Sequence, residues 1–155
     1  MRTRTMTDCK RLELLVETVK YCQKVKKLGM PSSCYTKALR EPVHYLWERR
    51  AGSKIKSAQF RSPAAKGLKF GKRELVYDHV VPFIILQGKL LSLKEVTQDS
   101  VRQVLENFGT ICLITKAEDD RLNKAGLGRS MPTDEKDIWA RYHAVGINPV
   151  ENVVE

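Results

Sequence analysis

The chain has 155 residues, of which 42% are hydrophobic and 30% are charged, and its formal net charge is +10. This length allows one full hydrophobic core and excludes two domains of ordinary size. No apolar run approaches the roughly 20 residues of a membrane-spanning helix, and the amino-terminal segment lacks the apolar core of a signal peptide, so we expect a cytoplasmic protein with no membrane partner.

The order of the segments predicts a single α+β domain that is mainly helical and contains a small β element. We expect a helical N-terminal part over residues 1–51, a basic loop over 52–73, an α+β core over 74–146 and a tail over 147–155. The four cysteines show no zinc-ligand spacing, so they are expected to be reduced thiols. They are Cys9, Cys22, Cys34 and Cys112.

The first helix is predicted over about residues 8–28. Thr7 or Asp8 can cap its amino end, and Gly29 stops it. Its apolar residues follow the i, i+3, i+4 spacing of one helix face, at Leu12, Leu15, Val16, Val19 and Cys22.

A second helix is predicted from Ser32 or Ser33 to Leu39. Pro42 then either kinks this helix or opens a new one that ends at about Gly52. His44 lies within an apolar part of this segment, which favours a structural role for it.

Positive charge is concentrated in the first half of the chain. Residues 1–73 contain 19 Lys/Arg and 5 Asp/Glu, whereas residues 74–155 contain 9 and 13. Such a basic run repels itself unless it meets a polyanion, and phosphate backbones are the common one, so we favour nucleic-acid contact over a merely solvated loop. Nine cations, with no acidic residue among them, are the predicted contacts: Arg49, Arg50, Lys54, Lys56, Arg61, Lys66, Lys69, Lys72 and Arg73.

The middle of the chain predicts a strand followed by two helices. Residues 74–81 are rich in β-branched and aromatic side chains, which favours a strand. Pro82 can open a short apolar helix that reaches Leu91. The next helix is capped by Thr97 and ended by Gly109.

Residues 110–115, TICLIT, predict a short buried strand that runs directly into a helix closed by Gly126. Thr115 and Glu118 have the spacing of a capping box, and we favour this role for Glu118 over a catalytic one. Asp134 is predicted to cap a last helix.

The segments YDHVVP and ICLITKAEDDRLN resemble the HNH, or ββα-metal, endonucleases, a family that includes the nuclease domains of DNA-cleaving colicins. The resemblance covers at most residues 75–123. In that family the first strand bears a His that acts as general base, often beside a metal ligand. The helix that follows a later strand supplies further ligands four residues apart. The resemblance therefore implies a small metal-dependent nuclease.

Carried over to this chain, the resemblance implies that His79 is the general base and that Asp78 is the metal ligand beside it. Asp119 and Asn123 match the two ligand positions of the helix, and their spacing puts both on one helical face. Oxygen ligands of this kind suit Mg²⁺ or Mn²⁺ better than zinc. The ion would polarise the scissile phosphate while neutral His79 takes a proton from water, and Lys116 would neutralise an adjacent phosphate.

Other interpretations remain open. Asp78 and His79 can equally be a buried, satisfied polar pair, and His143 is most simply a surface residue or a cation at a helix end. The sequence has neither a phosphate-binding glycine loop nor a nucleophile elbow, so we expect no nucleotide cofactor and no serine hydrolase. The protein is then a metal-dependent nuclease, a non-catalytic nucleic-acid-binding or regulatory protein, or an inhibitor or immunity-like protein that binds an acidic partner.

Overall fold

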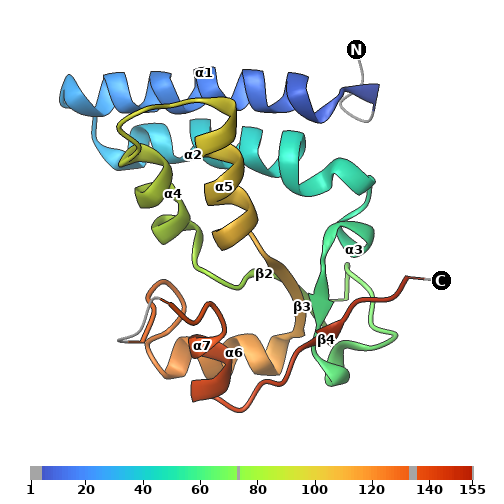
Figure 1. The fold of residues 1–155 in the computed structure, drawn as a ribbon. Coiled ribbons are helices and arrows are strands. Elements are labelled where there is room, and N and C mark those ends of the chain that lie inside the picture. Colours follow the sequence, from blue (N-terminus) through green and yellow to red (C-terminus); the bar gives the residue numbers. More distant parts are fainter. Residues whose placement is uncertain (1–4, 73, 133–135, 155) are drawn as a thin grey trace.

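The structure is a computed structural model that describes residues 5–72, 74–132 and 136–154. The expected class is confirmed, because the protein is α+β, mainly helical, with one small sheet. Figure 1 shows the long helices at one side of the molecule and the sheet with two shorter helices at the other. None of the described helices combines the length and the apolar character that a membrane crossing requires.

The helical layer begins with α1 (Asp8–Lys27), close to the predicted bounds, and Thr7 caps it by accepting a hydrogen bond from the Lys10 amide. The second helix, α2 (Ser32–Pro42), continues past its predicted end at Leu39. Pro42 does not end the helical segment. The helix continues as a π-helical turn, η2 (Val43–Trp47), and then as a 3₁₀ turn, η3 (Glu48–Ala51). A wider, π-helical turn accommodates Pro42, because the proline ring crowds the preceding turn and proline has no amide hydrogen to donate.

Two further helices complete this layer, α4 (Phe83–Leu91) and α5 (Gln98–Phe108). Both were predicted, with Pro82 at the start of α4 and Thr97 as the cap of α5. The layer has its own apolar core, which removes these side chains from water and is the main source of its stability. Its fully buried members include Leu12, Leu15, Val19, Leu39, Leu86, Leu90 and Val101.

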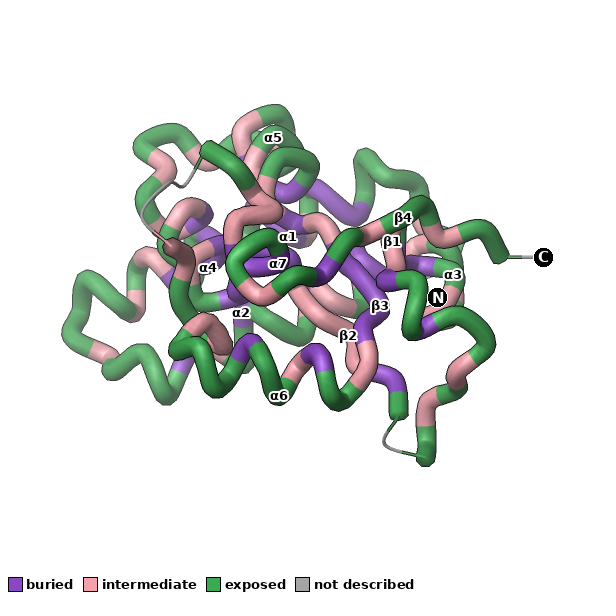
Figure 2. Tube along the Cα trace, turned by 90° about the horizontal axis from the view of Figure 1, so that it is seen from below, coloured by how far each residue is buried: buried purple, intermediate pink, exposed green. Residues whose placement is uncertain are grey.

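The sheet has four strands in the order β2-β3-β1-β4. The two predicted strands are β2 (Leu75–His79) and β3 (Ile111–Thr115), which pair antiparallel. The other two were not predicted: β1 (Phe60–Arg61) pairs parallel with β3, and β4 (Val150–Glu151) pairs antiparallel with β1. Figure 2 shows β3 buried along nearly its whole length, as expected for an interior strand.

The unit after β3 is a helix that starts without a loop, α6 (Lys116–Lys124). The expected capping box is present. Thr115 accepts from the Glu118 amide, and Glu118 accepts from the Thr115 amide and also, at 2.5 Å, from the Ser62 hydroxyl. Glu118 therefore joins the start of α6 to the residue after β1, which agrees with the structural role preferred for it.

Two regions differ from expectation. The segment predicted as a basic loop contains a short helix α3 (Lys54–Ser57), strand β1 and a 3₁₀ turn η4 (Pro63–Ala65). The segment predicted as a tail contains β4, which the Asn152 side chain anchors by donating to the carbonyls of Ile55 and Ala58. The last helix is shorter than predicted, α7 (Ala140–Ala144), and its expected cap, Asp134, lies outside the described residues.

The cap of α5 gives a direct test of the helical layer. Thr97 and Ser100 exchange backbone-to-hydroxyl hydrogen bonds of 2.9 and 3.1 Å. We expect Thr97→Ala to lower the free energy of unfolding by about 1 kcal/mol, measured by urea denaturation. The control is Ser92→Ala, whose hydroxyl donates to a carbonyl that already accepts an amide, so its effect should stay within about 0.5 kcal/mol. Equal losses in the two variants would contradict the assigned cap.

Candidate functional site

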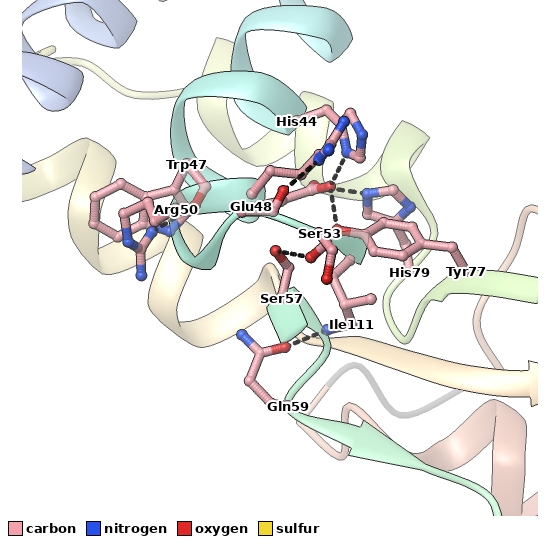
Figure 3. A network of polar contacts seen from close by, with 12 residues as sticks. His44, Trp47, Glu48, Arg50, Ser53, Ser57, Gln59, Tyr77, His79 and Ile111 are labelled. Atoms are coloured by element: carbon pink, nitrogen blue, oxygen red, sulfur yellow. Dashed lines mark hydrogen bonds and ion pairs between the residues drawn. The ribbon is translucent and has the colours of Figure 1, made fainter. Parts of the chain in front are cut away.

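A buried carboxylate joins the helical layer to the sheet. Glu48, the first residue of η3, has a side chain that is only 2% exposed, yet both of its oxygens accept hydrogen bonds (Figure 3). Oε1 accepts from His44 Nδ1 at 2.9 Å and from the Tyr77 hydroxyl at 3.1 Å, while Oε2 accepts from His79 Nε2 at 2.7 Å. The four residues, Glu48, His44, Tyr77 and His79, form what we call the Glu48 cluster.

The hydrogen-bond partners of Glu48 stabilise its ionised form. Burial acts to raise the pKa of this carboxyl, but the hydrogen bonds and the electrostatic attraction of His44 and His79 outweigh burial and lower it to about 2. Glu48 is therefore ionised at neutral pH. An ionised carboxylate can only accept, so His44 Nδ1 and His79 Nε2 must each carry a proton.

Tyr77 completes the cluster from the middle of β2. Burial raises the pKa of its hydroxyl, and the neighbouring charge of Glu48 raises it further, so Tyr77 stays a neutral donor. Its ring stands edge-on to both imidazoles, with centroids 5.4 Å from His44 and 5.9 Å from His79. Each imidazole is thus fixed by a charge-assisted hydrogen bond and by an aromatic neighbour.

The cluster borders a pocket of about 520 Å³, which we call the histidine pocket. His44, Tyr77 and His79 all line it. The rest of its lining comes from α2 and η2 and is polar, with two cations and one carboxylate: Ser33, Thr36, Lys37, Arg40, Glu41 and Tyr45. A polar pocket of this size with two histidines and two longer cations suits a small anionic group, such as one phosphate with part of its substituent.

Asp78 belongs to a different set of contacts from His79, as expected for successive residues of a strand. Its Oδ2 accepts from the Tyr142 hydroxyl at 2.7 Å and from Arg141 Nη1 at 3.3 Å. Arg141 is 1% exposed and also donates to the carbonyls of His79 and Val80, both at 2.9 Å. Burial raises the pKa of Asp78, against the lowering effect of Arg141 and Tyr142.

The other predicted metal ligands lie on α6. Asp119 Oδ2 contacts Lys116 Nζ at 3.4 Å and Asn123 Nδ2 at 3.5 Å. Asp78, His79 and Asp119 border one further pocket, of about 480 Å³, that Arg129 also lines. Within residues 5–72, 74–132 and 136–154, however, no three His, Cys, Asp or Glu side chains gather as a metal-binding group. The assignment of Asp78, Asp119 and Asn123 as metal ligands therefore stays a prediction.

The predicted nucleic-acid contacts divide into two kinds. Arg49 and Arg50 are engaged within the protein: Arg49 donates to the Gly52 carbonyl, and Arg50 donates to the Trp47 carbonyl and lies 3.5 Å from the Trp47 ring centroid. Lys116 forms ion pairs with Asp119 and Asp120, and these hydrogen bonds raise its pKa.

The remaining cations form no ion pair with any acidic residue of the described ranges, and we call them the unpaired cations. They are Lys54, Lys56, Arg61, Lys66, Lys69 and Lys72. Arg73, the ninth cation of the predicted run, lies outside the described residues.

Sequence reasoning missed Glu48 and placed His44 in an apolar surrounding, whereas its ring is bound to the Glu48 carboxylate. His44 and Glu48 stand four residues apart, a spacing that brings side chains together on a helix, and this was the one signal available. Tyr77 and His79 are 29 and 31 residues further along the chain, so the rest of the cluster is a product of the tertiary fold. His143 pairs with Asp137 at 3.2 Å on the surface, as the simplest interpretation of it suggested.

The lowered pKa of Glu48 predicts an acid-sensitive contribution to stability. A folded-state pKa of about 2 against an ordinary 4.5 stabilises the protein above pH 4.5, by an amount on the order of 3 kcal/mol, and this contribution is lost as the pH falls from 4.5 towards 2. We expect Glu48→Gln to be less stable than the wild type at pH 6 and the difference to shrink by pH 2.5, measured by urea denaturation. Glu17→Gln, at an exposed site, is the control. A difference that does not change with pH would contradict the assigned ionisation.

The geometry stands without support from relatives. Comparison with models of protein families, with curated proteins and with solved structures gives no match. The features of the chain that bear on its function are therefore the Glu48 cluster, the histidine pocket and the unpaired cations.

Proposed function

We propose that this protein binds nucleic acid through the unpaired cations, with the histidine pocket as the place where a phosphate is held. The observation that carries the proposal is the absence of any ion pair between six cations of residues 54–72 and the described acidic residues. Uncompensated charge at this density repels itself, and a phosphate backbone relieves the repulsion while releasing its own counterions.

The placement of these cations supports a shared surface. Lys54, Lys56, Lys66, Lys69 and Lys72 are exposed. Arg61, Lys66 and Lys69 line one hollow, of about 600 Å³, together with residues of β2 and β3 and the segment after β4. Phosphate contacts of this kind position a nucleic acid without reading its sequence.

A metal-dependent HNH-like endonuclease is the second candidate. It is supported by the antiparallel pairing of β2 with β3, by the direct passage from β3 into α6, and by the position of His79 beside Asp78 at the end of β2; α4 and α5 lie between the two strands in the chain. Mg²⁺ or Mn²⁺ would be the metal. A non-catalytic nucleic-acid-binding or regulatory role, an inhibitor or immunity-like role with an acidic protein partner, and a cytoplasmic location also remain predictions.

Binding is tested by charge neutralisation. We expect the triple variant Lys66→Gln, Lys69→Gln, Lys72→Gln to bind DNA and RNA more weakly in retardation assays. The slope of log affinity against log salt should fall by about 2 to 3, since each lost phosphate contact removes roughly 0.7 to 0.9.

The matched control neutralises Lys24, Lys26 and Lys27, three exposed cations at the end of α1 on the opposite side of the molecule (Figure 1). Equal weakening in both triple variants would reduce the proposal to a net-charge effect. No retardation by the wild type at low salt would overturn it and favour the acidic protein partner.

The second candidate is tested by metal addition. We expect plasmid DNA or RNA to be cleaved only after Mg²⁺ or Mn²⁺ is added. His79→Ala should remove cleavage by at least about 100-fold and leave retardation nearly unchanged, since a general base contributes to the reaction more than to binding. Cleavage that persists in His79→Ala would show that the base is assigned wrongly.

A further inference from the structure

Two imidazoles, those of His44 and His79, line the histidine pocket, whereas a site with a general base alone needs only one. His44 and His79 come from different layers of the fold, and each donates one ring proton to a separate oxygen of Glu48. The tautomers are thereby fixed, which leaves His44 Nε2 and His79 Nδ1 as the second nitrogens of the two rings. Neither of these nitrogens forms a hydrogen bond with a described residue, and both rings line the same pocket.

The two imidazoles share one buried carboxylate, each on a separate oxygen. One negative charge, buried at 2% exposure, balances one imidazolium, while two imidazolium rings on the same carboxylate would repel each other. Acid–base catalysis by this pair would use one neutral ring, whose second nitrogen accepts a proton, and one charged ring, whose second nitrogen donates one. A proton acceptor and a proton donor beside one pocket are what general acid–base catalysis requires.

The other wall of the pocket suits a phosphodiester. Lys37 and Arg40 of α2 can neutralise the phosphate oxygens, because the ion pair of Lys37 with Glu41 is long, at 3.7 Å, and lies on the surface. Tyr45 is 52% exposed beside the same pocket and offers a ring on which a base can stack.

We propose that His44 and His79 form an acid–base pair that cleaves RNA by transfer of the phosphodiester to the neighbouring 2′-hydroxyl. The neutral imidazole takes the 2′-hydroxyl proton, the 2′-oxygen forms a bond to phosphorus, and the bond from phosphorus to the 5′-oxygen breaks. The charged imidazole donates its proton to the departing 5′-oxygen. The products are a 2′,3′-cyclic phosphate and a 5′-hydroxyl. The proton count balances, and no co-reactant is consumed.

RNA is the substrate class because the nucleophile then belongs to the substrate. A 2′-hydroxyl is held beside the phosphorus by the ribose itself, and an intramolecular nucleophile gains a large effective concentration over free water. This inference deepens the proposed function and rests on it, since it assigns a reaction to the nucleic acid that the unpaired cations hold.

The test uses the full chain in EDTA with three oligonucleotides of one sequence: all RNA, all DNA, and RNA methylated at each 2′-oxygen. Only the unmodified RNA should be cleaved, and mass spectrometry should find 2′,3′-cyclic phosphate ends. His44→Ala and His79→Ala should each lower the rate by at least about 100-fold. His143→Ala, at a surface histidine outside the pocket, is the matched control and should cleave at the wild-type rate.

Glu48 acts through the two histidines and is a positioning residue. The wild-type rate should show a bell-shaped pH dependence, and Glu48→Gln should change the shape of the profile as well as the maximum, since the amide cannot stabilise an imidazolium. The titratable or charged groups that face the pair around the histidine pocket are Lys37, Arg40, Glu41, Tyr45, Glu48 and Tyr77. On the other side of His79, Asp78, Asp119 and Arg129 line the second pocket that it borders. A Glu48→Gln profile that is lower but unchanged in shape would show a merely structural role.

The outcomes separate this inference from the proposals before it. RNA that is retarded but stays intact in EDTA would overturn the acid–base pair while leaving nucleic-acid binding in place. Cleavage that needs Mg²⁺ or Mn²⁺ and survives His44→Ala would overturn it in favour of the metal-dependent candidate. Absence of both retardation and cleavage would remove the binding proposal as well. Circular dichroism of each variant confirms that a lost activity does not reflect a lost fold.

Discussion

The ionised carboxylate of Glu48 is the contact on which the arrangement of this protein depends. The helical layer and the sheet have separate apolar cores, and Glu48 reaches from the first into the second to meet Tyr77 and His79. A buried charge is costly unless several donors surround it, and here three donors do so. The two layers therefore cannot slide apart without exposing Glu48 or leaving it unpaired, and the histidine pocket keeps its shape for the same reason.

The end of β2 is fixed from the other side by Arg141. This guanidinium donates to the His79 carbonyl while Glu48 binds the His79 ring, so the backbone and the side chain of His79 are held by separate groups. Asp78 is used in that second set of contacts, where it balances Arg141 and accepts from Tyr142. The two neighbouring side chains thus have different partners: Asp78 binds Arg141 and Tyr142, and His79 binds Glu48, while both border the pocket that Asp119 lines.

The parts of the fold that could be predicted are those determined by residues close together in the sequence. The caps at Thr97 and Thr115 and the two five-residue strands were all found, because each depends on residues close together in the chain. The two-residue strands β1 and β4 are too short to show any period, and only pairing with distant segments defines them. The Glu48 cluster was missed for a similar reason, since two of its three hydrogen bonds join residues 29 and 31 positions apart. The metal ligands inferred for Asp78, Asp119 and Asn123 stay a prediction.

The unpaired cations and the histidine pocket are linked by the path of the chain. The segment that carries the cations begins just after Glu48 and ends at β2, which bears Tyr77 and His79. The hydrogen bonds of Glu48 to these two residues therefore hold the two ends of this segment together. Lys54, near the start of this segment, has its Nζ 5.8 Å from the Tyr77 ring centroid and 5.6 Å from that of Phe70. The segment therefore contacts the Glu48 cluster through Lys54. Under the proposed function, a phosphate backbone bound to Lys54 would lie beside Tyr77, which lines the histidine pocket, so the cations that bind and the groups that react would be different residues acting on one strand.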